Sequence, residues 1–260
     1  MLEPLTWRLK LFLANPASAK YSLQRRLYNL VIPRLPGKRV RCNICGWEGH
    51  KFEAIAGASY IRYNAVCHGC GSTERNRALI EYMNKNGDFS EKGLRYLDIG
   101  PLRAFGDYFR SKGCDYISID LYSSSAMIKM DATQMGFADD EFDFIICSHV
   151  LEHIRDDIQA IKEMFRVLRS SGLCYIIVPF NKARTDTIEY TEPNPLIPEH
   201  VRSYGLDITG RIKSVGFRVE EINLVSELNN KDDISLYALG KEETCFLCTK
   251  GNTQYRKPRG

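Results

Sequence analysis

Apolar residues gather in short runs along residues 94–250, and segments of helical or loop character separate these runs. The clearest strand-like runs are LRYLDI, DYISIDL, EFDFIICS and LCYIIVPF, which begin at residues 94, 115, 141 and 173. Strands that alternate with helices are typical of a parallel sheet covered by helices on both faces. The pattern therefore predicts an α/β fold for this part of the chain.

Two helices and a closing hairpin complete this prediction. The stronger helical pattern spans residues 151–168, and Ser170-Ser171-Gly172 is expected to end it. Its apolar stripe consists of Ile154, Ile158, Ile161, Phe165 and Leu168. A second helix is expected near residues 206–215. Beyond it, FRVEEINLV and ETCFLCTK predict an antiparallel pair at the sheet edge, joined by a long connection.

Residues 1–40 form a basic amphipathic arm. Residues 1–41 hold nine Lys or Arg but a single acidic residue, Glu3. Apolar residues recur in the arm at the spacing of one helix face, at Leu23, Leu27, Leu30 and Val31. A helix of this kind lies on a surface, which is the protein's own core, an anionic membrane face or nucleic acid. A basic tail, residues 251–260, closes the chain.

Four cysteines have the spacing of a metal site. Cys42 and Cys45 form one C-x-x-C pair, and Cys67 and Cys70 form a second pair after an intervening loop. Two such pairs present four thiolates to one tetrahedral ion, so we expect a structural Zn²⁺ in a zinc-ribbon module spanning residues 41–74.

Other cysteine and histidine positions are expected to stay outside this site. His68 lies inside the second pair and is expected to point outward. Cys245 and Cys248 also form C-x-x-C, but they lie on a predicted strand, where residues three apart face opposite sides. We therefore interpret them as core thiols.

Cysteine usage and hydropathy indicate the compartment. The nine cysteines fit metal ligation in a reducing compartment better than a disulfide framework. No apolar run reaches the roughly 18 residues of a membrane-spanning helix. The first residues mimic a secretory signal, but Arg8 and Lys10 interrupt its apolar segment. We expect a cytoplasmic protein, with peripheral membrane contact through the arm as an open alternative.

Three aspartates lie at or just beyond the ends of predicted strands, at Asp98, Asp120 and Asp131. Parallel sheets bind ligands at the carboxyl ends of their strands. The carboxylate of Asp120 follows the first strand at a distance where it can accept hydrogen bonds from both hydroxyls of a ribose. Asp131 could accept from an adenine amino group.

Several motifs resemble class I S-adenosylmethionine-dependent methyltransferases (methyltransferase type 11-like) over roughly residues 75–250. The similarity rests on LDIG at 97–100, ISID at 117–120 and DATQMGFADDEFDFIICSHVLEHI at 131–154. CGSTER at 70–75 and EHVRSYG at 199–205 further resemble a subgroup with an N-terminal zinc ribbon. The resemblance implies a Rossmann-like methyltransferase fold, with a mostly parallel seven-stranded sheet and a terminal antiparallel hairpin.

The resemblance also implies a set of cofactor-binding residues for S-adenosyl-L-methionine. They are Asp98 and Gly100 at the methionine pocket, Asp120 with Leu121 at the ribose, Asp131 with Ala132 at the adenine, and Cys147, Ser148 and His149 near the sulfonium.

One loop departs from the family pattern of an acid followed by three alternating glycines. Only Gly100 is present, because Leu102 and Ala104 occupy the second and third glycine positions. Pro101 restricts the backbone on both sides of itself, so we expect a specific alternative turn in which Leu102 points away from the ligand.

The segment His149-Val-Leu-Glu152-His153 allows several interpretations. H-x-x-E-H is an inverted zinc-protease motif, but here it begins at a strand end in a methyltransferase-like context. Some quinone-pathway O-methyltransferases carry an acid-x-x-Glu-His metal site at this place, and His149 replaces the acid. Glu152 and His153 could instead cap and orient the following helix.

Methylation of a hydroxyl would benefit from a base that titrates near neutrality, for which His149, His153 and His200 are the candidates. The Pro-bearing insertion at residues 181–204 has the composition of a lid. We expect O-methylation of a small molecule or a sugar or glycan precursor. Two alternatives stay open. One is an RNA methyltransferase that uses the zinc module and basic arm to hold phosphates, although the segment after the fourth strand lacks the motifs for base methylation. The other is a non-catalytic binding or scaffold protein with a degenerate cofactor loop.

Overall fold

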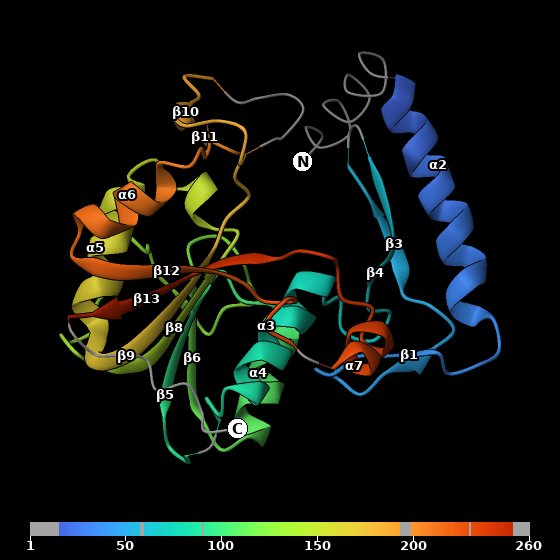
Figure 1. Cartoon of the computed structure of the whole chain (residues 1–260), viewed down its shortest axis with the longest axis horizontal. Helices are drawn as coiled ribbons and strands as arrows, with labels where there is room; N and C mark the ends of the chain where they lie inside the picture. Colours follow the sequence, from blue (N-terminus) through green and yellow to red (C-terminus); the bar gives the residue numbers. More distant parts are fainter. Residues whose placement is uncertain (1–15, 58–59, 90, 193–198, 229, 252–260) are drawn as a thin grey trace.

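The computed structural model describes residues 16–57, 60–89, 91–192, 199–228 and 230–251 (Figure 1). Its larger part is built on a seven-stranded sheet with the order β12-β13-β9-β8-β5-β6-β7. The five strands of the parallel part are β5 (Arg95–Ile99), β6 (Asp115–Asp120), β7 (Ile128–Lys129), β8 (Phe142–Ser148) and β9 (Leu168–Ile177). β13 (Thr244–Lys250) and β12 (Phe217–Asn223) add an antiparallel pair at one edge. The predicted Rossmann-like sheet with its terminal hairpin is confirmed.

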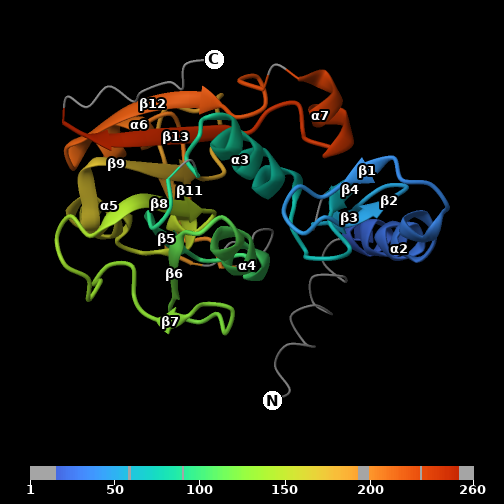
Figure 2. The same ribbon diagram turned by 90° about the horizontal axis from the view of Figure 1, so that it is seen from below.

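Helices cover both faces of this sheet (Figures 1 and 2). α3 (Glu74–Lys85) and α4 (Arg103–Ser111) bury their apolar residues on one face, and α5 (Asp157–Val167) and α6 (Ile208–Ser214) on the other. Alternate residues of each strand fill the two cores, as a two-residue period requires. Cys245 belongs to the first core and Cys248 to the second. The interpretation of these two cysteines as core thiols on opposite faces is confirmed.

The helix predicted over residues 151–168 is shorter than expected. Leu151–His153 form a 3₁₀ turn, η2, and α5 begins only at Asp157. The carboxylate of Asp156 accepts a hydrogen bond from the Gln159 backbone N–H at 3.0 Å, so this side chain caps the helix and sets its start. The prediction for Ser170-Ser171-Gly172 was also wrong, because these residues lie inside β9, where the pairing with β8 shifts register.

The N-terminal module combines two short antiparallel pairs with one helix. β1 (Val40–Arg41) pairs with β2 (Glu48–Gly49), and β3 (Glu53–Ala56) pairs with β4 (Ile61–Val66). α2 (Pro16–Val31), which continues into the 3₁₀ turn η1 (Ile32–Arg34), packs against β3 and β4. Figure 2 shows this module to one side of the large sheet, with α7 (Lys231–Leu236) beside it.

The inner face of α2 is not the face that the apolar spacing predicted. Asn29 exchanges two hydrogen bonds with the backbone of Ala54, at 3.1 and 2.7 Å, and the rings of Tyr28 and Tyr63 lie 4.9 Å apart. The stripe of Leu23, Leu27, Leu30 and Val31 faces outward and is exposed. The alternative in which this stripe packs on the protein's own core is therefore wrong for the described part of the chain.

Arg77 of α3 joins the N-terminal module to the rest of the molecule. Its guanidinium is fully buried and donates to the carbonyls of Ser72 at 2.8 Å, Ala65 at 3.0 Å and Tyr237 at 2.8 Å. It also stacks over the ring of Phe52 at 3.9 Å from the centroid. One side chain therefore links the second cysteine knuckle, β4 and the segment after α7.

Part of the predicted lid forms a small hairpin. β10 (Ile188–Glu189) pairs antiparallel with β11 (Arg202–Ser203), and Tyr204 bridges to Phe180 just after β9. Residues 193–198 of the insertion lie outside the described residues. Among the described residues, no helix has the length and apolar character needed to cross a membrane.

Candidate active site

The four N-terminal cysteines converge on one point. Cys42 Sγ lies 3.7 Å from Cys70 Sγ, and Cys45 Sγ lies 3.6 Å from Cys67 Sγ. Tetrahedral zinc with Zn–S bonds of about 2.3 Å separates its sulfur atoms by about 3.8 Å, so the four thiols fit this ion. The backbone carbonyl of the first cysteine in each pair accepts the N–H of the glycine that follows the second, at 2.9 Å in both knuckles.

His68 points away from this cluster. Its Nδ1 lies 2.7 Å from a carboxylate oxygen of Glu53, and its side chain is largely exposed. The expectation that His68 faces outward is confirmed. With four sulfur ligands and no open position, the cluster has the form of a structural site.

The loops after β5, β6 and β8 meet around Gly100. Gly100 has φ +70°, and a Cβ at this position would lie 2.4 Å from Val150 Cγ2 and 3.9 Å from Asp120 Oδ2. Its N–H donates to the Ile119 carbonyl at 3.0 Å, which holds the loop against β6. This bare backbone at the carboxyl ends of three parallel strands is the place where such a sheet takes a ligand.

The absence of the other two loop glycines has a geometric explanation. Leu102 has φ −76° and ψ 126° and precedes α4, and Ala104 lies in the first turn of that helix. Both residues pack against the core on the α4 side of the sheet. Neither position requires a positive φ, so neither requires glycine. The expectation that Leu102 points away from the ligand side agrees with this packing.

The three aspartates of the predicted cofactor site have different surroundings. Asp120 Oδ1 accepts backbone N–H bonds from Tyr122 at 2.7 Å and Ser123 at 2.6 Å, which leaves Oδ2 toward Gly100. Asp131 Oδ1 accepts from the N–H and the hydroxyl of Thr133, both at 2.8 Å.

Asp98 is buried beneath the loop. Its carboxyl group accepts the Tyr116 hydroxyl at 2.7 Å. Burial raises the pKa of Asp98 to about 7, although the Tyr116 hydrogen bond acts in the opposite direction. The other implied residues, Leu121, Ala132, Cys147 and Ser148, lie on or just beyond the same strand ends. The Cys147 thiol is fully buried in the core, so only its backbone could face a ligand.

His149 begins the segment after β8 in an unusual conformation. Its φ of +58° is rare for a residue with a side chain, and its N–H donates to the Ile177 carbonyl at 2.7 Å. Its Nδ1 lies 3.2 Å from Glu152 Oε1. Glu152 is buried, and neither carboxylate oxygen accepts a well-aligned hydrogen bond within the described part of the chain.

The charge state of His149 follows from its surroundings. Burial lowers the pKa of His149, the neighbouring Glu152 raises it, and the guanidiniums of Arg75 and Arg62 lower it again. The net direction is downward, so the imidazole is neutral at neutral pH. Arg62 and Arg75 come from β4 and α3, and sequence reasoning did not assign them a role; Arg75 lies inside the quoted CGSTER motif.

The structure brings two further histidines to Glu152. One nitrogen each of His153 and His200 and one Glu152 oxygen lie within 4.8 Å of one another, and the two rings meet edge to face with centroids 4.8 Å apart. His153 Nδ1 contacts the Glu199 carbonyl at 3.1 Å. These are donor types that also bind divalent metals. Thus all three predicted base candidates belong to one cluster, although the segments that carry them are far apart in sequence.

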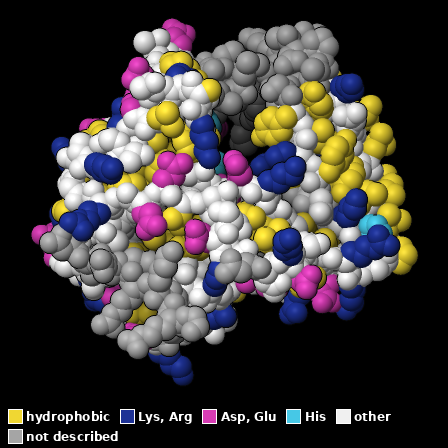
Figure 3. Space-filling model, viewed as in Figure 1, with side chains coloured by type: hydrophobic (Ala, Val, Ile, Leu, Met, Phe, Trp, Pro, Cys, Tyr) yellow, Lys and Arg dark blue, Asp and Glu magenta, His cyan; other side chains and the backbone are white. Residues whose placement is uncertain are grey.

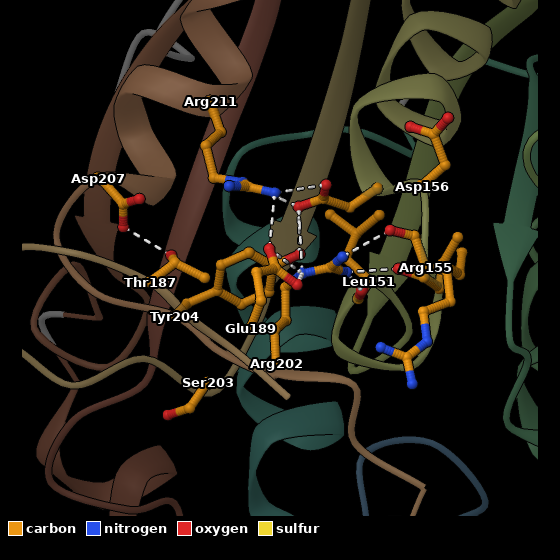
Figure 4. Close-up of polar contacts among 12 residues, drawn as sticks. Leu151, Arg155, Asp156, Thr187, Glu189, Arg202, Ser203, Tyr204, Asp207 and Arg211 are labelled. Carbon is orange, nitrogen blue, oxygen red and sulfur yellow. Dashed lines mark hydrogen bonds and ion pairs between the residues drawn. The ribbon is translucent and has the colours of Figure 1, made fainter. Parts of the chain in front are cut away.

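Arg202 explains how His200 reaches this cluster, and Figure 4 shows the contacts of Arg202 with Leu151, Arg155 and Glu189. Its buried guanidinium donates to the carbonyls of Leu151 and Arg155, at 2.8 and 2.7 Å, and pairs with Glu189 at 3.0 Å. A single side chain thereby ties the β10–β11 hairpin to η2 and the start of α5. The EHVRSYG motif thus fixes the hairpin to the segment after β8 through Arg202. The sequence did not predict this role because Leu151 and Arg155, which Arg202 binds, lie about fifty residues earlier in the chain.

Comparison with known proteins decides the class. A family described as methyltransferase domain matches residues 72–222, which is more than half of the chain. The chain belongs to this methyltransferase family. This family consists of S-adenosylmethionine-dependent methyltransferases with the class I fold.

The relatives are distant and partial. The methyltransferase is 32% identical over 111 residues to a demethylmenaquinone methyltransferase of Bacillus velezensis, covering 41% of this chain and 40% of the relative. It is 25% identical over 123 residues to a ubiquinone/menaquinone biosynthesis C-methyltransferase of Haemophilus ducreyi, covering 46% and 47%. The chain therefore spans less than half the length of these curated relatives.

One solved structure with a similar fold is a 1,6-didemethyltoxoflavin-N1-methyltransferase of Burkholderia thailandensis, described with bound S-adenosylhomocysteine. It shares 12% identity at a TM-score of 0.45, over 67% of this chain and 79% of that one. These comparisons give the family of the chain and do not identify an acceptor.

Proposed function

We propose that the methyltransferase acts on a hydroxyl oxygen of a small molecule or of a sugar or glycan precursor, with His149 as the general base. The observation that supports this proposal is the pairing of His149 with the buried Glu152 at the end of β8. That strand end adjoins the Gly100 loop, on which the cofactor is expected to bind. A neutral imidazole held by a carboxylate is the arrangement that accepts a hydroxyl proton.

The chain's own residues divide the work as follows. S-adenosylmethionine, when bound, supplies an electrophilic methyl group to an in-line displacement. Glu152 Oε1 lies 3.2 Å from His149 Nδ1, and in the complex with the acceptor it would take the Nδ1–H and so fix the tautomer in which Nε2 carries a lone pair. Nε2 takes the hydroxyl proton as the acceptor oxygen bonds to the methyl carbon and the carbon–sulfur bond breaks. The bonding electrons remain on sulfur, so the products are a methyl ether, S-adenosylhomocysteine and a protonated His149.

The surroundings of His149 also favour an acceptor with a negative group. Arg62 and Arg75 lie close enough to lower the pKa of His149, and an anionic group on the acceptor would compete for them with Glu74, which pairs with Arg62 at 2.5 Å, and with Glu243, which lies near Arg75. Charged and histidine side chains gather around a hollow between the β10–β11 hairpin and the N-terminal module in Figure 3. Guanidinium groups pair well with phosphate or carboxylate. A sugar phosphate, or a glycan precursor with an acidic group, suits such a site better than a neutral apolar ring.

The β10–β11 hairpin would cover the bound acceptor. Arg202 anchors its base to η2, and His200 next to this anchor reaches the cluster around Glu152. A hairpin anchored beside this cluster is suited to exclude water during transfer.

Product analysis tests this function. The purified protein is incubated with radiolabelled S-adenosylmethionine and with panels of sugars, sugar phosphates, phenols and RNA. We expect label on a hydroxylated, anionic small molecule, and no label on the matched deoxy compound. Methyl found on nitrogen or carbon, or label on RNA that disappears with rising salt, would contradict the proposal.

A short exposure to EDTA provides a second arm. A base supplied by the protein requires no divalent ion, so turnover of the identified acceptor should be unchanged. If EDTA abolishes turnover and an added divalent ion restores it, Glu152, His153 and His200 are assigned as metal ligands. His149 alone would then not account for activation of the acceptor.

A further inference from the structure

The outward face of α2 carries a continuous stripe of exposed aliphatic side chains. Leu23, Leu27, Leu30 and Val31 expose 59%, 58%, 63% and 51% of their surfaces. Their spacing places them along one side of a single helix. In Figure 3 apolar side chains gather along the edge of the molecule that α2 forms, with basic side chains between them. Aliphatic side chains exposed singly are ordinary, but four along one helix face are an interaction surface.

Folding of the N-terminal module does not explain this stripe. α2 already has a partner on its other side, where Asn29 and Tyr28 contact Ala54 and Tyr63. The helix is thus fixed in an orientation that presents its more polar and aromatic side to β3 and its leucines to the exterior. An amphipathic helix held this way round is arranged to bind something outside the chain.

The charge around the stripe identifies the partner. Residues 16–41 contain seven Lys or Arg and no Asp or Glu. Lys20 and Arg26 flank the leucines and are exposed, and Arg34 lies at the end of the helix, where its guanidinium donates to the Leu30 carbonyl at 2.7 Å. A second copy of the chain would bring an equal positive charge against this surface, so self-association is disfavoured. The phosphates of RNA would satisfy the basic residues and leave the leucines in water.

We infer that α2 is a docking helix for an anionic lipid bilayer. Leucines of a surface-bound helix enter the boundary between head groups and acyl chains, while Lys and Arg pair with lipid phosphates. A helix with basic residues on both sides of its apolar stripe lies in the plane of the bilayer surface, so this attachment is peripheral. The inference is independent of the acceptor, because it uses only the N-terminal module.

Vesicle sedimentation of the full chain tests this inference. Vesicles of phosphatidylglycerol should retain the protein, with retention falling as salt rises, and vesicles of phosphatidylcholine alone should bind it at least tenfold more weakly. The double variant Leu27→Gln/Leu30→Gln should lose at least tenfold in partitioning to phosphatidylglycerol. Removal of Lys20 and Arg26 as Lys20→Gln/Arg26→Gln should cost about fivefold for each charge.

Two controls separate docking from damage. Leu206→Gln changes an exposed leucine outside the helix, with 47% of its surface exposed, and should leave partitioning unchanged. Binding of S-adenosylhomocysteine should be equal in all variants, which shows that the fold is intact. Partitioning that the leucine substitutions do not alter would overturn the inference. A dimer in light scattering that Leu27→Gln/Leu30→Gln dissociates would overturn it as well, and would assign the stripe to a second copy.

Discussion

Gly100 and Val150 approach each other so closely that a Cβ on Gly100 would lie 2.4 Å from Val150 Cγ2. Gly100→Ala should therefore displace the loop that the cofactor requires, and it also meets the strain of a positive φ. We expect a loss of at least about tenfold in S-adenosylhomocysteine affinity by calorimetry, since about 1.4 kcal/mol is tenfold. Gly93→Ala is the matched control, because Gly93 has φ +76° with nothing within 4 Å of its Cβ position. It should lose about 1–2 kcal/mol of stability and no affinity.

Asp120 offers one carboxylate oxygen to its own turn and keeps the other toward Gly100. Asp120→Ala should reduce S-adenosylhomocysteine affinity by about ten- to a hundredfold, because hydrogen bonds to a charged acceptor contribute about 1.5–3 kcal/mol. Asp115→Asn, at the other end of β6, is the control and should bind normally. Equal affinities for Asp120→Ala and the unaltered enzyme would remove Asp120 from the cofactor site.

The pH dependence of turnover reports on His149. Because the pKa of His149 is lowered by burial, the neutral base persists below the ordinary histidine range and is lost only as the pH falls further. We expect kcat/KM to be flat around neutrality and to decline on the acid side. His149→Gln should lower kcat by about a hundredfold or more. His50→Gln, a distant histidine beside the Pro36 carbonyl, should leave the profile unchanged.

Glu152 acts through His149, so its substitution should have a distinct signature. The carboxylate raises the pKa of His149 against the effect of burial. In Glu152→Gln the acid limb of the kcat/KM profile should therefore move to lower pH, and kcat should fall while KM changes little. An unmoved limb would show that Glu152 supports only the fold.

Buried Asp98 makes stability depend on pH. Its carboxyl keeps a proton up to about pH 7 in the folded protein, whereas an unfolded aspartate releases it near about pH 3.9. Between these values the unfolded state binds fewer protons, so this contribution to stability is lost as pH rises. Asp98→Asn should remove a decline of about 2–3 kcal/mol between pH 5 and pH 8, as measured by urea unfolding. Asp107→Asn, with a 90% exposed side chain, should retain the decline.

Metal analysis of cysteine variants tests the zinc module. Cys45→Ser removes one of four converging sulfurs, so the zinc content should fall from about one ion per chain toward zero. The variant should also unfold at a lower temperature, because ligation contributes directly to the folding of such modules. Cys114→Ser changes a buried thiol outside the cluster and should keep its zinc. Zinc retained in full by Cys45→Ser would exclude Cys45 as a ligand.

The sequence patterns predicted what depends on local or short-range chemistry. Only one structural interpretation fits the spacing of the alternating strands, of the two C-x-x-C knuckles and of the aspartates at strand ends. The start of α5 was misplaced, because Leu151 and Ile154 continue the apolar period of the helix although the chain is not helical there. Only the capping hydrogen bond of Asp156 distinguishes the two, and spacing does not reveal it.

Long-range contacts account for what the patterns missed. In the sequence Arg202 resembles an ordinary surface arginine, whereas in the fold the hairpin buries it against Leu151. Likewise, the leucines of α2 fit an inward face as well as an outward one. Their direction is set by Asn29, whose amide pairs with the backbone of Ala54 on a different element.

The buried guanidinium of Arg77 couples two parts of the molecule that look separable in sequence. Its carbonyl partners belong to β4, the second cysteine knuckle and the segment after α7. Unfolding of either the zinc module or the sheet domain alone would therefore leave a buried guanidinium without its hydrogen-bond acceptors. The protein should consequently melt in a single cooperative transition. Oxidation of the cysteines would then destabilise the sheet domain together with the zinc module. Methyl transfer would fall because less of the protein is folded, although no sulfur of the cluster lies at the candidate catalytic site.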